Sequence, residues 1–173
     1  MLQTRIRFGL ILLFLGLGFL LMVKTGFSNA LPLFLGAILL LVTHFLFGSV
    51  WVAFNHLKRG NPMKAEMIVN QIKRPEWLIK RNRAYYYFIK GMIDLQNKDL
   101  EDGEKNLLTS LETGMEKPTD KALVNLNLAH IYYLRKKFDS ARKHLAEAKA
   151  QEVNDLLIKD NIEKLEKAMA AAN

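Results

Sequence analysis

The chain has 173 residues, half of them hydrophobic, which is enough for one domain of ordinary size. It has no cysteine, which excludes disulfides, thiolate metal sites and cysteine nucleophiles. The net charge is +8, but residues 55–90 hold nine Lys/Arg against two Glu, whereas residues 91–173 hold thirteen Lys/Arg and fifteen Asp/Glu. The positive charge is therefore local, and we expect no nucleic acid among the partners.

Two apolar runs occupy the first 54 residues, which contain three Lys/Arg and no Asp or Glu. A helix needs about 20 residues, and at least about 17, to cross the hydrocarbon core of a membrane. We therefore predict two transmembrane helices, at about residues 6–24 and 31–54, joined by a turn in "KTGFSNA". They would form an N-terminal hairpin followed by a soluble part.

The orientation of the hairpin follows from the positive residues beside its ends. Two Lys/Arg precede the first run, one lies in the turn, and nine follow the second run within residues 55–90. This favours an integral membrane protein of the bacterial inner membrane with both termini in the cytoplasm. A cleaved signal peptide is the competing interpretation, because Ser28-Asn29-Ala30 offers small residues at a suitable spacing. Cleavage there would leave one span.

Small residues recur in pairs twelve positions apart, and the pairs recur every 38 residues. The pairs are Ala53 and Ala65, Gly91 and Gly103, and Ala129 and Ala141. Two antiparallel helices cross closely where the facing residues are small. An aliphatic residue follows each pair by four positions and would fill the space beside the crossing; these are Val69, Leu107 and Leu145. The pattern predicts three stacked helix pairs.

These units resemble the tetratricopeptide repeat family. The third unit matches best, with "NLNLAHIYY" followed by "FDSARKHLAEA", and the second keeps Tyr87, Gly91, Leu100, Gly103 and Leu107. The family period is 34 residues, and the four extra residues here fall between units. The resemblance covers roughly residues 46–153, with repeats at about 46–78, 84–115 and 122–152. It implies an all-α solenoid that binds proteins and performs no chemistry.

The two ends of this solenoid carry further predictions. Residues 154–173 would form a capping helix whose apolar stripe is Val153, Leu157 or Ile158, Ile162, Leu165 and Met169. At the other end, the second span and the first repeat overlap. We therefore predict one continuous helix over residues 31–58, about 42 Å long at 1.5 Å per residue, with no flexible linker.

Four consecutive aromatic residues, in "AYYYF", fall on the first helix of the second unit. Such a helix is flanked on both sides and also lines the concave groove, so most of its circumference is covered. Two stripes are predicted to face that groove and to bind a protein or peptide through aromatic anchors. They consist of Tyr85, Phe88 and Met92, and of Leu123, Leu126, Asn127, His130 and Tyr133. If the C-terminal helix closed the groove, these residues would be core instead.

The basic residues after the second apolar run have two interpretations. They can keep this end of the chain in the cytoplasm, and they can bind anionic lipid headgroups at about 1 kcal/mol per residue. The set is Lys58, Arg59, Lys64, Lys73, Arg74, Lys80, Arg81 and Arg83.

The sequence lacks the motifs of phosphate-binding loops, serine hydrolases and zinc proteases. We expect no catalytic residues, cofactor or metal, and therefore no enzyme. We predict a membrane-anchored scaffold that binds a protein partner at the cytoplasmic membrane surface. The alternative is an accessory subunit of a membrane transport or envelope-assembly complex in which the hairpin is the functional part. Self-association into a homo-oligomer is a third possibility.

Overall fold

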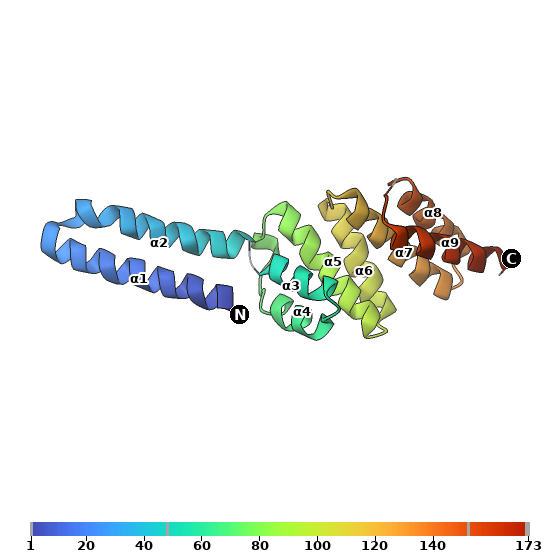
Figure 1. The fold of residues 1–173 in the computed structure, drawn as a ribbon, viewed down its shortest axis with the longest axis horizontal. Helices are drawn as coiled ribbons and strands as arrows, with labels where there is room; N and C mark the ends of the chain where they lie inside the picture. Colours follow the sequence, from blue (N-terminus) through green and yellow to red (C-terminus); the bar gives the residue numbers. More distant parts are fainter. Residues whose placement is uncertain (1, 48, 152, 172–173) are drawn as a thin grey trace. The chain divides into compact units, whose positions relative to one another are not determined.

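A computed structural model describes residues 2–47, 49–151 and 153–171, without the side chains of residues 2–5, 7 and 44–47 (Figure 1). Within the described residues the chain is α-helical, with one short 3-10 helix and no strand. The predicted all-α fold class is therefore confirmed for that part of the chain. The chain divides into two compact units, Met1–Asn82 and Arg83–Asn173, and each unit is held together by its own internal contacts.

The first unit begins with two helices that lie side by side, α1 (Leu2–Thr25) and α2 (Phe27–Phe47) (Figure 1). Gly26 alone joins them, with φ +94°, a left-handed conformation that glycine adopts without steric cost. The seven-residue turn predicted here is wrong. Polar side chains around Gly26 bond to helix carbonyls, since Thr25 Oγ1 donates to Leu21 O at 2.9 Å and Asn29 Nδ2 donates to Thr25 O at 3.0 Å. The two helices therefore continue up to the glycine.

Reciprocal glycine–phenylalanine contacts hold α1 against α2. A Cβ added to Gly36 would lie 2.9 Å from the Phe14 ring, and one added to Gly18 would lie 3.0 Å from the Phe34 ring. Each ring thus packs on a glycine of the other helix. Away from these contacts the two helices expose large apolar side chains; for example, Leu12 is 70% exposed and Leu39 is 64% exposed.

One helix in the described residues is long and apolar enough to cross a membrane, at Phe8–Thr25 in α1. The apolar part of α2, Phe27–Thr43, is shorter than this criterion requires. The first predicted span is thus supported by length and composition, whereas the second is not established.

The continuous helix predicted over residues 31–58 is wrong. Helix α2 ends at Phe47, and α3 (Val50–Lys58) begins after Ser49, whose backbone (φ −100°, ψ 19°) lies outside the helical range. Glycine has a lower helix propensity than the apolar residues around it, and the serine hydroxyl competes for backbone hydrogen bonds, which together favour a break at this sequence. Gly48 itself lies outside the described residues.

The predicted helix pairs form, and their turns share one backbone geometry. The pairs are α3 with α4 (Pro62–Val69), α5 (Lys80–Gln96) with α6 (Leu100–Thr113), and α7 (Pro118–Leu134) with α8 (Phe138–Lys149). Gly60, Lys98 and Lys136, which are 38 positions apart, have φ values of +71°, +64° and +59°. At each turn the next N–H donates to a carbonyl five residues back, in Asn61, Asp99 and Lys137. This is the Schellman helix end, so the period is a feature of the backbone too.

The small residues of each pair lie at buried positions. Ala53, Ala65, Ala129 and Ala141 have no exposed surface. In the second pair, a Cβ on Gly91 would meet Leu107 Cγ at 2.8 Å, and one on Gly103 would lie 3.5 Å from the Gly91 carbonyl oxygen. Helices α5 and α6 therefore approach each other as closely as the sequence pattern predicted.

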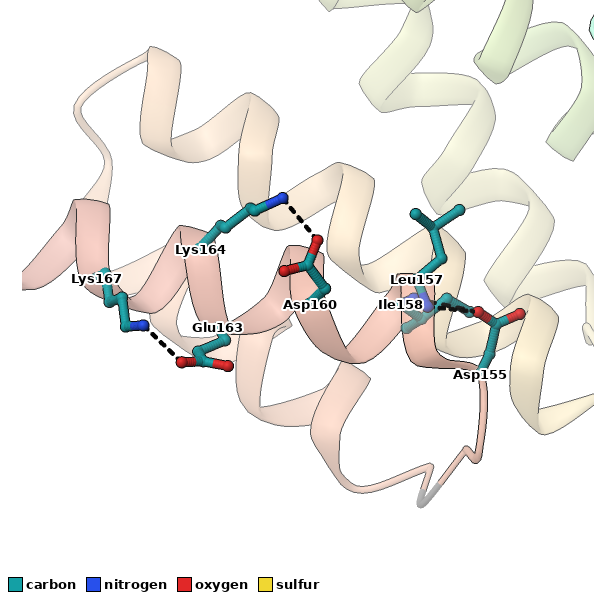
Figure 2. A network of polar contacts seen from close by, with 7 residues as sticks. All are labelled: Asp155, Leu157, Ile158, Asp160, Glu163, Lys164 and Lys167. Carbon is teal, nitrogen blue, oxygen red and sulfur yellow. Dashed lines mark hydrogen bonds and ion pairs between the residues drawn. The ribbon is translucent and has the colours of Figure 1, made fainter.

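Helix α9 (Leu156–Ala171) packs against α7 and α8 and covers the apolar end of the second unit. Its buried stripe is Ile158, Ile162, Leu165 and Met169, so the stripe runs through Ile158, and Leu157 is 69% exposed. Asp155 caps the helix by accepting from the N–H groups of Leu157 and Ile158, at 3.0 and 3.2 Å (Figure 2). The predicted start at residue 154 is therefore two residues early.

Candidate partner-binding groove

A cavity of about 470 Å³ lies among three helices of the second unit. Helices α5 and α7 contribute six of its lining residues, namely Met92, Leu123, Leu126, Asn127, His130 and Tyr133. Helix α9 contributes Asn161, Lys164, Leu165 and Ala168. We call this site the α5–α7–α9 groove. Because His130, Asn161 and Lys164 are exposed, the groove is accessible to solvent.

Six of the eight residues predicted to bind a partner line this groove, and two do not. Tyr85 and Phe88 are each only 1% exposed, and their rings contact each other edge to face, with centroids 6.5 Å apart. The prediction that these two rings are partner anchors is therefore wrong. They are core residues of the second unit.

A buried hydrogen bond explains why Tyr85 faces inward. Its hydroxyl donates to Oδ2 of Asp120, in the first turn of α7, and the Asp120 carboxyl is itself buried. The bond joins α5 to α7 across 35 residues of sequence. A buried carboxylate needs such a donor, so the tyrosine is held in the core by its polar end as well as by its ring.

Both apolar and polar side chains line the groove. The Asn127 side chain donates a 2.7 Å hydrogen bond from its Nδ2 to Leu123 O. The Tyr133 ring packs against the Phe138 ring, with centroids 6.1 Å apart. The Lys164 ammonium group donates to Asp160 Oδ2 at 2.6 Å (Figure 2). Among the described lining residues, none is a carboxylate. The groove can thus accept apolar side chains and the polar groups of a peptide backbone.

Helix α9 forms one wall of the groove without filling it. Its lining residues follow the helical spacing i, i+3, i+4 and i+7 from Asn161 to Ala168. The sequence predicts this helix as a cap or as a helix that closes the groove, and it does not predict that α9 residues line an open groove. The signal was present, because the polar stripe through Asn161 and Lys164 lies beside the buried stripe.

A polar network links α6, α7 and α8 outside the groove. Glu104 accepts a hydrogen bond from the Tyr132 hydroxyl at 2.6 Å and forms an ion pair with Arg135. Burial and the bond to Glu104 raise the pKa of Tyr132 to about 12. The Tyr132 ring stacks on His144, with centroids 5.3 Å apart.

The protonation of His144 is also restricted. Asn125 donates its Nδ2 to Lys121 O, so its Oδ1 faces His144 Nδ1 at 2.9 Å and accepts from it. The neutral ring with its hydrogen on Nδ1 makes this bond, and the charged ring would make it too, so the bond sets the tautomer and not the charge. Burial, and then the charge of Lys143, lower the pKa of His144 below its ordinary value.

We expect the free energy of unfolding to fall as the pH drops below about 6.5, the ordinary pKa of histidine. In that range the unfolded chain binds a proton at residue 144 before the folded chain does, so stability decreases toward lower pH. Urea unfolding measured at a series of pH values checks this. His144→Gln should reduce the slope relative to the unsubstituted protein. Equal slopes in the two proteins would contradict the assignment.

The eight basic residues predicted to bind lipid headgroups lie in both units. Seven are exposed and belong to the first unit, namely Lys58, Arg59, Lys64, Lys73, Arg74, Lys80 and Arg81. Arg83 is half-buried and belongs to the second unit. Three of the exposed cations lie over aromatic rings of the first unit.

Comparison of this chain with protein-family models, with curated proteins and with solved structures found no match. Its function is therefore inferred from its own residues and geometry.

Proposed function

We propose that this chain is a membrane-anchored scaffold of tetratricopeptide type that binds a segment of a protein partner at the cytoplasmic surface of a bacterial inner membrane. The binding site is the α5–α7–α9 groove. The partner segment is an apolar helix or an extended peptide, and the chain acts by binding and not by catalysis.

The groove is the single observation that carries this proposal. Aligned side chains from three helices surround a cavity of about 470 Å³. Leu123, Leu126 and Met92 offer apolar contacts, and Asn127 and His130 offer hydrogen bonds. A concave surface of this composition suits a peptide that inserts alternate side chains and satisfies its polar groups at the edges.

The apolar hairpin supports the membrane anchor. Helix α1 contains a stretch that meets the length and composition of a membrane span, and both helices expose large apolar side chains. An apolar surface of this extent is unfavourable in water and favourable in lipid. Two spans with cytoplasmic termini agree with the excess of Lys/Arg in residues 55–90.

Site-specific photo-crosslinking of the full chain in native membranes tests the proposal. A photoreactive residue at position 130, in the groove, should capture one discrete protein. The same residue at position 105, an exposed position of α6, should not capture it. Equal capture at both positions, or crosslinks from position 130 to α9 alone, would refute partner binding in the groove. The hairpin would then become the candidate functional part, as in an accessory subunit of a membrane complex.

A further inference from the structure

Helix α4 exposes methionines where a surface helix normally exposes polar residues. Met63 and Met67 lie one turn apart and are 75% and 55% exposed. The opposite face of α4, with Ala65, Ile68 and Val69, is buried and packs on α3. Both faces of this eight-residue helix are therefore partly apolar, and the outward one is not used in the packing of α3 on α4.

A tryptophan in the same unit is also exposed. Trp77, in the 3-10 helix η1 (Pro75–Trp77), is 48% exposed, and the Arg74 guanidinium carbon lies 4.8 Å from its ring centroid. Elsewhere in the unit Arg81 lies 5.2 Å from the Trp51 ring and Lys58 lies 5.5 Å from the Phe54 ring. Aromatic rings and cations are thus paired three times.

The charge of this region indicates which kind of surface the exposed apolar side chains contact. Residues 55–82 contain seven Lys/Arg and only Glu66 and Glu76 as carboxylates. Exposed methionine and tryptophan among cations suit the boundary between lipid headgroups and acyl chains, where apolar side chains enter the membrane and cations bind phosphate.

Chain length favours a lipid surface over a protein surface. The chain leaves the apolar helix α2 at Phe47 and reaches Met63 after sixteen residues, nine of which form α3. If the hairpin lies in the bilayer, this tether keeps α4 within reach of the headgroups.

We propose that the outward face of α4 and Trp77 insert into the interfacial region of an anionic bilayer, while the neighbouring Lys and Arg side chains bind headgroup phosphates. This inference rests on the membrane anchor of the proposed function. It adds a second contact, which attaches the first helix pair to the membrane surface.

The absence of native cysteine allows a direct test with single labels. Full-length M67C, labelled with an environment-sensitive fluorophore, is reconstituted into vesicles of phosphatidylglycerol and phosphatidylcholine. We expect a blue-shifted emission and loss of intensity when brominated lipids are included. A label on E112C, at an exposed position of α6, should show neither change, and a label on L12C in α1 should be quenched strongly.

Each outcome of this test has one meaning. If Leu12 is quenched and Met67 behaves like Glu112, the anchor stands and the interfacial contact is wrong. If Leu12 is not quenched, the anchor itself is wrong, and the contact with it. Replacing all phosphatidylglycerol with phosphatidylcholine should reduce the quenching at Met67 and not that at Leu12. Unchanged quenching at Met67 would overturn the role of the cations.

Discussion

Phe88→Ala is expected to lower the free energy of unfolding of the second unit by about 3–5 kcal/mol, as typical for a buried phenylalanine in a core. The ring is 1% exposed and packs edge to face on Tyr85, so its removal leaves a cavity and loses apolar burial. Urea unfolding of the full chain in detergent, followed by circular dichroism, measures the change.

Met92→Ala, one helical turn further along α5, is the matched control. Its side chain is half-buried and lines the groove, so we expect a smaller loss of stability. If Phe88→Ala were no more destabilising than Met92→Ala, Phe88 would not be a core residue. Its original interpretation as a partner anchor would then have to be restored.

Gly91→Ala should destabilise the α5–α6 pair by about 1–3 kcal/mol, the usual cost of overpacking a core. The added methyl group would lie 2.8 Å from Leu107 Cγ and 3.1 Å from the Leu107 backbone nitrogen, so the two helices must move apart. This cost outweighs the gain in helix propensity from glycine to alanine, which is at most about 1 kcal/mol.

Gly16→Ala makes the same chemical change where nothing lies within 4 Å of the new Cβ. It should therefore leave the thermal unfolding midpoint unchanged or raise it. Equal effects of the two alanine variants would contradict a close crossing of α5 and α6 at Gly91.

The helix pairs were predictable from sequence because their cause is local and repeated. Small residues twelve positions apart allow the two helices of each pair to cross closely, and such a crossing requires a tight turn between the helices. The structure adds what no spacing could show, which is that Lys98 and Lys136 adopt the left-handed conformation that Gly60 adopts at the first turn. Their side chains give no sign of it, since lysine has no preference for that region.

Tyr85 and Phe88 show where the pattern stops being informative. Their spacing from Met92 puts all three near one face of α5, and sequence alone cannot tell how far the neighbouring helices cover that face. Tertiary contacts decide it, since Asp120 lies 35 residues away and draws the Tyr85 hydroxyl inward. For the same reason the sequence left open whether the C-terminal helix closes the groove, because the answer depends on where a terminal helix packs.

The start of α3 illustrates a different limit. The hydropathy of residues 31–54 is continuous, so a pattern based on hydropathy predicts one helix through Ser49. The backbone at Ser49 nevertheless leaves the helical range, and α3 begins as a separate helix that packs on α4. Apolar character does not mark a helix end when both flanking helices are apolar, and only the Gly48-Ser49 pair signalled it.

Filling the groove is the sharpest test of partner binding there. Ala168 lines the groove and is half-buried, so Ala168→Trp should occupy the cavity, whereas Ala171→Trp adds the same ring at an exposed position near the end of α9. The measurement is the yield of the partner crosslink from position 130 in each background. If the partner binds in the groove, Ala168→Trp abolishes the crosslink and Ala171→Trp preserves it. A crosslink of full yield in folded Ala168→Trp protein would show that the partner does not bind in the α5–α7–α9 groove.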